Sequence, residues 1–378
     1  MNKYIPVNIP LLDGNEKKNL IECIDTGWIS SEGPFVEKFE EQMANLVGRK
    51  YAVAVSNGSV AIDCAIEALD ISEGDEIIMP SFTIISCVSQ ILRNGAVPIF
   101  VDSDIEHFNM KVEDIERNIT KKTKAIMVVH IYGLPVDMNP ILDLATKYNI
   151  KIIEDAAEAH GQKYHNKYCG SFGAISIFSF YPNKHITTGE GGMILTDDVD
   201  LYNKCKALRN LCFKPQKRFL HDDLGWNFRM TNLQAALGCA QLERLDTFVH
   251  LKRKMGNLYN DILSEYSEYI QLPMMETQYS TNIFWVYTVV LKENLAKKIN
   301  AAKVMDILGS NNIGTRPFFF PLHKQPIVNK YFNSSDSLEL PNCEYISENG
   351  FYLPSGLGNT EDDFLKSAAE LIKIIKNT

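Results

Sequence analysis

Two neighbouring stretches decide the fold, IIEDAAEAHG at residues 152–161 and ISIFSFYPNKHITTGEGG at residues 175–192. Each starts as a short run of mainly apolar and β-branched residues and then turns polar or glycine-rich, which is typical of a buried strand of a parallel sheet. Ligands of open α/β sheets bind at the carboxyl ends of such strands. Glu154 and Asp155 follow the first run and Lys184 follows the second, so we expect a functional site there.

The same pattern extends over residues 50–200, where short β-rich runs alternate with segments of helical apolar spacing. This alternation predicts an α/β protein whose large domain holds a mainly parallel seven-stranded sheet flanked by helices. The predicted strands are residues 51–56, 76–80, 97–102, 125–130, 151–155, 175–180 and 193–196. The predicted helices between them are residues 59–69, 83–93, 111–119 and 138–149.

Beyond the sheet, residues 230–263 form a long amphipathic stretch without proline, which predicts one continuous helix. The elements expected after it are a strand at residues 282–291, a helix near 299–310 and a last helix near 361–376. They indicate a smaller α+β domain. We therefore expect a large domain over residues 1–245 and a small C-terminal domain over residues 246–378.

Charge, cysteine spacing and apolar run length each disfavour a class of protein. The 378 residues carry 38 Lys and Arg against 47 Asp and Glu, a net charge of −9, which disfavours a nucleic-acid-binding protein. The eight cysteines show no CxxC pair and no zinc spacing, so we expect no metal and mostly buried thiols in a reducing compartment. Prolines interrupt the amino terminus and no apolar run approaches about 20 residues, which predicts a cytoplasmic protein without a membrane partner.

A phosphate site is predicted where the strand ending at Ser56 meets a helix through Asn57, Gly58 and Ser59. Backbone N–H groups at a helix N-terminus, together with a hydroxyl, bind anions. In the alternative interpretation, Ser59 only caps the helix. The second glycine cluster, residues 189–192, is no dinucleotide fingerprint, because Ile194 occupies the last glycine position.

Asp155 and Lys184 are candidates for the two ends of one aromatic ring. A strand-end carboxylate can meet a cationic ring nitrogen or cap a following helix, and a lysine in a glycine-rich loop can form a Schiff base or lie on the surface. They are 29 residues apart, enough for the chain to leave one strand end and return along a neighbour. Glu158 and His160 are weaker candidates, with ordinary helix positions as the alternative.

The ordered motifs SNGS, PSFT, IIEDAAEAHG, SIFSFYPNK, TTGEGG and GWNFRMTNLQAALGCAQLERLD resemble those of the DegT-type sugar aminotransferases, and among them the perosamine synthase-like enzymes. The resemblance spans residues 29–358. It implies the fold type I architecture of aspartate aminotransferase, pyridoxal 5'-phosphate (PLP) as cofactor and a homodimer. It also implies that Lys184 forms the Schiff base and moves the proton, while Asp155 pairs with the pyridinium nitrogen.

The resemblance assigns further contacts to the cofactor. Gly58, Ser59 and Ser179 would bind its phosphate, and Asn227 would enter the phosphate site of the neighbouring subunit. Glu158 stands where the family places a Gln, Glu or His near the ring hydroxyl. At the position of Ile84 many relatives carry an aromatic residue that stacks on the ring, so the chain departs from the family there.

The implied reaction moves the amino group of L-glutamate onto a nucleotide-linked 4-keto-6-deoxy sugar for surface polysaccharide biosynthesis. One alternative substrate is a small phosphorylated ketone such as dihydroxyacetone phosphate, which would give an amino alcohol phosphate. A regulator without turnover is disfavoured because no DNA-binding segment is evident. A dehydratase is disfavoured because Lys184 stands where the sugar 3-dehydratases carry histidine.

Candidate substrate residues lie in two segments. The loop at residues 212–223 carries Lys214, Lys217 and Arg218, which either neutralise substrate phosphate or are plain surface charges. The segment TRPFFFPLH at residues 315–323 carries Arg316 and His323, which either face the substrate or stabilise the fold.

Overall fold

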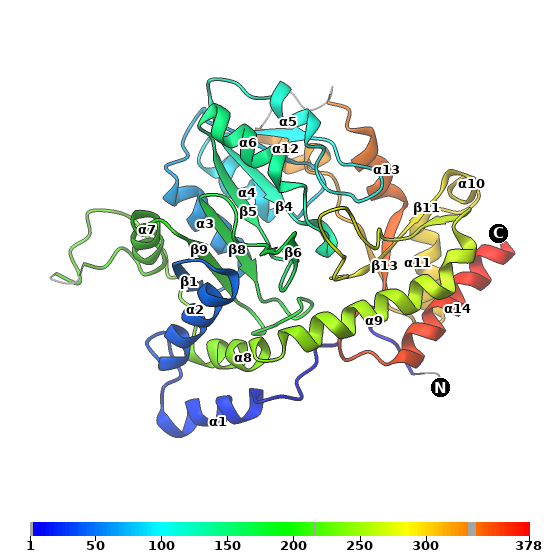
Figure 1. Ribbon diagram of the computed structural model, residues 1–378, viewed down its shortest axis with the longest axis horizontal. Coiled ribbons are helices and arrows are strands. Elements are labelled where there is room, and N and C mark those ends of the chain that lie inside the picture. The colour runs from blue at the N-terminus through cyan, green and yellow to red at the C-terminus, as the bar shows by residue number, and fades with distance from the viewer. Residues whose placement is uncertain (1–2, 215–216, 332–337) are drawn as a thin grey trace.

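A seven-stranded sheet forms the centre of the molecule (Figure 1). The structure is a computed structural model and describes residues 3–214, 217–331 and 338–378. The strand order is β1-β9-β8-β5-β4-β2-β3. Strand β9 runs antiparallel to both of its neighbours, and β8, β5, β4, β2 and β3 run parallel to one another. The strands are β1 (Tyr51–Val55), β2 (Glu76–Pro80), β3 (Val97–Val101), β4 (Thr123–Val129), β5 (Lys151–Asp155), β8 (Ile175–Ser179) and β9 (Gly192–Thr196). The predicted α/β class and mainly parallel sheet are confirmed.

Helices cover both faces of this sheet, because neighbouring residues of a buried strand point in opposite directions. Val53, Ile153 and Ile177 pack in a core with α3, α4 and α7, whereas Ala54 and Phe178 pack on the other face with α2 and α8. Helix α6 covers the remainder of that second face. The helices of this part are α1 (Glu16–Thr26), α2 (Pro34–Val47), α3 (Gly58–Ala68), α4 (Ser86–Arg93), α5 (Glu113–Arg117), α6 (Met138–Tyr148), α7 (Val199–Arg209) and α8 (Asn232–Leu242).

The carboxyl-terminal part contains a second sheet with the order β10-β11-β13-β12. Its own apolar core joins this sheet to α9, α11 and α14, and α9 passes below the large sheet to lie beside α14 (Figure 1). The division into domains after residue 245, where α9 begins, stays a proposal. The elements here are α9 (Leu245–Leu263), β10 (Ile270–Gln271), β11 (Tyr287–Leu291), α10 (Glu293–Ala296), α11 (Ala301–Ser310), β12 (Arg316–Pro317), α12 (Pro326–Tyr331), α13 (Pro341–Asn349), β13 (Gly350–Leu353) and α14 (Glu361–Asn377).

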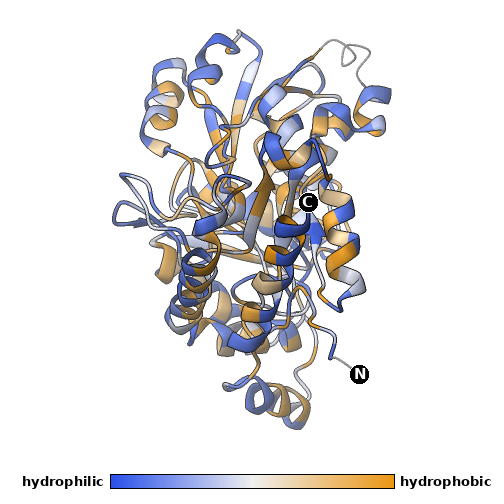
Figure 2. Cartoon of the chain, turned by 90° about the vertical axis from the view of Figure 1, so that its right-hand side faces the viewer, coloured by the Kyte–Doolittle hydropathy of each residue, from blue (hydrophilic) through white to orange (hydrophobic). Residues whose placement is uncertain are grey.

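The short elements that complete the description are β6 (Lys163–Tyr164), β7 (Lys167–Tyr168) and the 3-10 turns η1 (Ile131–Gly133), η2 (Ser264–Tyr266) and η3 (Leu322–Lys324). Hydrophilic and hydrophobic residues share the outer helices, whereas the central strands are mostly hydrophobic (Figure 2). In the part of the chain that the structure describes, no helix combines the length and apolarity needed to cross a membrane.

Two predicted elements differ from the structure. The single helix at residues 230–263 is wrong, because α8 ends at Leu242 and α9 starts at Leu245, with Arg244 between them paired to Asp13. Residues 243 and 244 both favour a helix, so the local sequence does not predict the break between α8 and α9. The strand predicted at residues 282–291 starts only at Tyr287, because Phe284 has a positive φ of 49° that extended strands do not adopt.

Candidate active site

A cavity of about 680 Å³ opens at the carboxyl ends of β5 and β8, beside the N-terminus of α3. Parallel strands that end at one edge, with helices beginning there, bring loops from distant parts of the chain together. The cavity is lined by seven of the predicted site residues, namely Gly58, Ser59, Ile84, Asp155, Glu158, Ser179 and Lys184.

Asn57, and not Ser59, caps α3. The Asn57 side chain accepts a hydrogen bond from the backbone N–H of Val60 (3.0 Å), while the Ser59 hydroxyl lies 2.7 Å from that of Ser86. A Cβ atom added to Gly58 would lie 2.6 Å from the Ser179 side chain, so only glycine lets the two segments approach this closely. The interpretation of Ser59 as a mere cap is therefore wrong, and its hydroxyl faces the cavity edge with Ser179.

Asp155 is a buried carboxylate with two protein donors. Its Oδ1 accepts a hydrogen bond from the backbone N–H of Ala157 (2.9 Å), and its Oδ2 accepts one from the thiol of Cys87 (3.4 Å). Burial raises the pKa of Asp155, and the nearby Lys184 opposes this. Residues 156–162 form turns, so Asp155 caps no helix and Glu158 and His160 are not helix residues. The alternative interpretations as a helix cap and as helix positions are therefore wrong, because a strand followed by alanines only resembles a strand-to-helix connection.

Lys184 and Glu158 face each other inside the cavity. The Lys184 ammonium lies 3.6 Å from a Glu158 oxygen and 3.9 Å from the centre of the Trp285 ring. Burial lowers the pKa of Lys184, which favours the neutral and nucleophilic amine, whereas Glu158 and Asp155 act against this shift. Glu158 also accepts a hydrogen bond from the backbone N–H of Tyr132 (2.8 Å), and burial raises its pKa to about 7.

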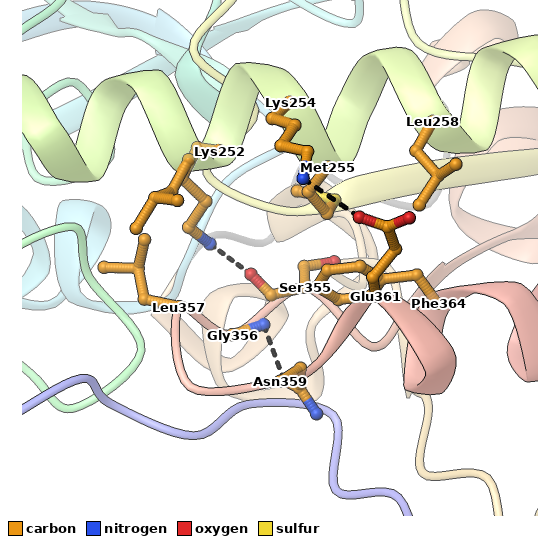
Figure 3. A pocket seen from close by; sticks show the side chains of 11 residues that line it. Lys252, Lys254, Met255, Leu258, Ser355, Gly356, Leu357, Asn359, Glu361 and Phe364 are labelled. Carbon is orange, nitrogen blue, oxygen red and sulfur yellow. Dashed lines mark hydrogen bonds and ion pairs between the residues drawn. The ribbon is translucent and has the colours of Figure 1, made fainter.

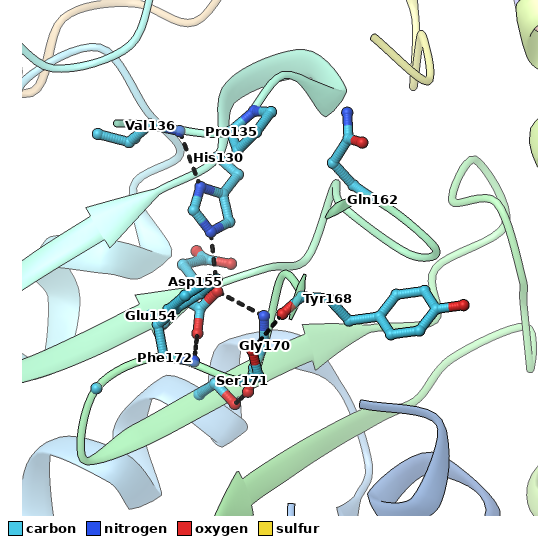
Figure 4. A network of polar contacts seen from close by, with 12 residues as sticks. His130, Pro135, Val136, Glu154, Asp155, Gln162, Tyr168, Gly170, Ser171 and Phe172 are labelled. Atoms are coloured by element: carbon cyan, nitrogen blue, oxygen red, sulfur yellow. Dashed lines mark hydrogen bonds and ion pairs between the residues drawn. The ribbon is translucent and has the colours of Figure 1, made fainter. Parts of the chain in front are cut away.

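A buried polar network holds the strand ends behind this site (Figure 4). Glu154 accepts hydrogen bonds from the backbone N–H groups of Gly170 and Phe172 and from His130 (2.9 Å). The other ring nitrogen of His130 accepts one from Val136 N–H (3.1 Å), so the ring is the Nε2–H tautomer. Although His130, Glu154 and Cys169 lie close enough to hold a metal, these hydrogen bonds occupy the histidine and carboxylate, and we assign them a structural role.

Comparison with known proteins identifies the family. Residues 10–371 match the sequence model of the DegT/DnrJ/EryC1/StrS aminotransferase family. The chain belongs to this family. It is 42% identical over 353 residues to the GDP-perosamine synthase of Escherichia coli O157:H7, covering 93% of both chains, and 40% identical to that of Vibrio cholerae, covering 99% and 98%. The solved E. coli GDP-4-keto-6-deoxy-D-mannose-3-dehydratase with bound hydrated PLP superposes with a TM-score of 0.88 at 26% identity, covering 98% of this chain and all of that one.

As a member of this family the chain is a PLP-dependent aminotransferase, and the cavity fits the cofactor. Hydroxyls and the first N–H groups of α3 suit a phosphate, and the glycine at residue 58 lets Ser179 approach the start of this helix. Asp155 has no cationic partner within 4 Å among the described residues, so its buried charge suits a protonated ring nitrogen. Lys184 supplies the amine for the aldehyde.

Aromatic residues of the second sheet and its approaches cover the cavity, and sequence reasoning missed them. Trp285 precedes β11, Phe319 follows β12, and Tyr352 belongs to β13. Tyr181 and Asn183 also line the cavity, beside Lys184. Tyr181 and Asn183 could have been found in the sequence because they stand next to Lys184. The aromatic residues Trp285, Phe319 and Tyr352 could not, because an aromatic residue in or near a strand usually belongs to the core.

The remaining predicted residues do not line the cavity. Asn227 is exposed and its backbone pairs with Asn210, while Lys214 pairs with Asp222. Lys217 and Arg218 are exposed. These four residues belong to the segment that follows α7, and a single chain does not bring them to Lys184.

His323 is fully buried outside the cavity, which contradicts its assignment to the substrate side. Its Nδ1 lies 2.6 Å from the Ser81 hydroxyl and its Nε2 lies 2.9 Å from Glu344, so it ties η3 to the end of β2 and to α13. Arg316 is exposed and pairs in register with Tyr352, which lines the cavity. Arg316 therefore lies one residue away from the lining, and its role stays a prediction.

Proposed function

We propose that this aminotransferase moves the amino group of L-glutamate to the keto carbon of GDP-4-keto-6-deoxymannose or a similar nucleotide-linked 4-keto-6-deoxy sugar, for surface polysaccharide. The products are 2-oxoglutarate and the amino sugar, so the reaction balances without another reagent. The observation that carries the proposal is the identity of 40–42% with GDP-perosamine synthases over nearly the whole chain.

We assign the binding of the cofactor to residues at its two ends. The N–H groups that begin α3, with the hydroxyls of Ser59 and Ser179, hold the phosphate, while Asp155 holds the proton on the ring nitrogen. When bound, PLP accepts the electron pair released as a C–H bond of the amino donor breaks. Ile84 packs on the ring with less stacking energy than an aromatic residue, by about 1 kcal/mol.

We assign proton transfer to Lys184. Its amine removes the proton from the α-carbon of glutamate in the first half-reaction and returns a proton to the former keto carbon in the second. Removal of the proton requires the neutral amine, which the burial that lowers the pKa of Lys184 supports, and the amine that has taken up a proton is the form that returns one. Glu158 lies 3.6 Å away and orients the amine toward the ring.

The site is complete, in this proposal, only in a homodimer. Asn227 is exposed, and its segment carries Phe219 and Leu224 with 84% and 92% of their surface exposed. Large apolar side chains this exposed favour a protein contact. We assign that contact to a second copy, with Asn227 entering the phosphate site of the partner.

A panel of ketones tests the substrate. The purified enzyme loaded with PLP is incubated with glutamate and either GDP-4-keto-6-deoxymannose or dihydroxyacetone phosphate, and 2-oxoglutarate release is followed. We expect turnover of the sugar nucleotide and none of the triose phosphate. The reverse result would establish the small phosphorylated ketone as the substrate, and no turnover of any ketone would favour a regulator.

A further inference from the structure

We propose that Lys252 is a positioning residue for transamination: its buried ammonium fixes the backbone of Trp285, whose ring covers the amine of Lys184. This inference rests on the role proposed for Lys184 but not on the identity of the ketone. Lys252 belongs to α9, outside the cavity that holds Lys184.

Lys252 lies in the interior with 2% of its surface exposed. Its Nζ donates hydrogen bonds to the backbone carbonyl of Trp285 (2.8 Å) and to that of Ser355. Figure 3 shows it reaching from α9 toward Ser355 at the edge of a small cavity of about 120 Å³. Among the described residues no carboxylate lies within 4 Å of this ammonium, and burial lowers its pKa to about 7. A lysine without a counter-charge is costly to bury, so its two contacts are specific features of the fold.

The two carbonyls face each other where a strand pair opens. Strands β11 and β13 pair antiparallel with Tyr287 opposite Leu353, so Trp285 and Ser355 are the next residues that would pair in the same phase. Trp285 and Ser355 lie outside the paired strands, and among the described residues Lys252 donates hydrogen bonds to both of their carbonyls. A buried carbonyl without a hydrogen-bond donor destabilises the fold. The lysine thus replaces the missing ladder bonds and sets the distance between the two segments.

Trp285 transmits this constraint to the reacting amine. Its indole N–H donates to the carbonyl of Asn183 (2.8 Å), its backbone N–H donates to that of Tyr132 (3.2 Å), and its ring face lies 3.9 Å from the Lys184 ammonium. Lys252 holds the same residue from its carbonyl side. A cation is stabilised over an indole face, so a shift of the ring changes both the direction and the basicity of Lys184.

The test compares Lys252→Met with Lys254→Met. Methionine keeps the length of the side chain and removes the donors. Lys254 is a matched control because it belongs to the same helix as Lys252 but lies at the surface, where its ammonium pairs with Glu361 of α14 (2.9 Å). The glutamate half-reaction of the PLP-loaded enzyme is measured alone, so the result does not depend on the ketone. We expect Lys252→Met to lower its rate constant about 10-fold or more with less than about a 2-fold change in the apparent Kd for glutamate. Lys254→Met should match the wild type.

Two spectroscopic readouts separate positioning from general destabilisation. In a Trp28→Phe, Trp226→Phe background only Trp285 remains, and its emission should shift in Lys252→Met and stay in Lys254→Met. The pH midpoint of the visible absorbance of the loaded enzyme, which reports the group at Lys184, should move in the same variant. A Lys252→Met protein with wild-type rate, emission and midpoint would overturn the proposal.

Two further variants cover poor folding and indirect effects. If Lys252→Met does not fold, Lys252→Gln carries its amide donors one bond short of the position of the lysine nitrogen and so away from the two carbonyls, and its rate and midpoint should both change. A folded Lys252→Gln with neither change would overturn the proposal. In a Trp285→Ala background, loss of Lys252 should reduce the rate little further, because the ring it positions is gone. Full additivity of the two losses would show that Lys252 does not act through Trp285.

Discussion

Three titratable residues share one buried space at the site, and their charges are interdependent. Asp155 and Glu158 are acids whose pKa burial raises, and Lys184 is a base whose pKa burial lowers. Lys184 stabilises the charged forms of both carboxylates and is stabilised by them, whereas the charge of Asp155 raises the pKa of Glu158. A substitution of one of these residues should therefore change proton transfer more than it changes the fold.

Replacement of Asp155 by Asn should separate cofactor binding from catalysis. The amide keeps the shape of the carboxylate and removes the charge proposed to hold the ring proton. We expect turnover to fall by about several powers of ten while PLP still binds through its phosphate and Lys184. Equilibrium dialysis measures the binding, and release of 2-oxoglutarate measures turnover. Near-normal turnover would mean that Asp155 has only a structural role.

The stability of the cofactor-free protein should depend on pH through Glu158. Its pKa rises from 4.5 to about 7, so between these values the folded state keeps a proton that the unfolded state has lost. This contribution is complete below pH 4.5 and disappears as the pH rises through 7. We expect Glu158 to lower the free energy of unfolding by on the order of 3 kcal/mol over that range. Urea unfolding of wild type and Glu158→Gln at several pH values measures it, and parallel curves would contradict it.

At the scale of elements, the cofactor site lies on packed elements, whereas the proposed nucleotide contacts lie on a loop outside the cavity. The ends of β5 and β8 and the start of α3 lie on the packed sheet, whereas the described residues 212–214 and 217–223 lie in the loop that follows α7 (Figure 1). Cofactor residues on packed elements keep their geometry, and substrate residues on loops can vary between enzymes. The loop at residues 212–223 is therefore the place where we expect the nucleotide to be bound.

Exchange of Lys214, Lys217 and Arg218 for Ala should weaken binding of the sugar nucleotide. Their charges contact a part of the substrate that does not react, so ground state and transition state lose the same binding energy. We expect KM for the sugar nucleotide to rise about 10-fold or more with kcat nearly unchanged. The KM for glutamate in the same variant is an internal control. An unchanged KM for the sugar would assign these residues to plain surface charge.

At the scale of the whole molecule, the dimer proposal predicts complementation between two inactive variants. Lys184→Ala and Asn227→Ala chains are mixed and reassembled. If Asn227 acts across the interface, each mixed dimer has one intact site and one doubly changed site. Random mixing should then restore about a quarter of the wild-type sites. Absence of recovery would show that Asn227 serves its own chain or has no role in the site.

The seven strands of the large sheet could be predicted from the sequence because each is a short apolar run ended by turn residues, a local property of the chain. The presence of Asp155 and Lys184 in one cavity could equally be predicted, since the carboxyl ends of parallel strands meet at one edge. The break between α8 and α9 was not, because Glu243 and Arg244 favour a helix and only packing on two different parts of the molecule separates the two segments.

The roles of His323, Trp285 and Lys252 were decided by tertiary structure alone. A histidine near a proline-rich turn has no local property that separates a substrate contact from the buried pairing with Ser81 and Glu344. The indole over Lys184 comes from about 100 residues further along the chain, and the lysine that holds it from another helix. Local periodicity and turn chemistry determine which strands form and which residues end them. The contacts of a side chain depend on segments distant in sequence, so only the folded chain determines them.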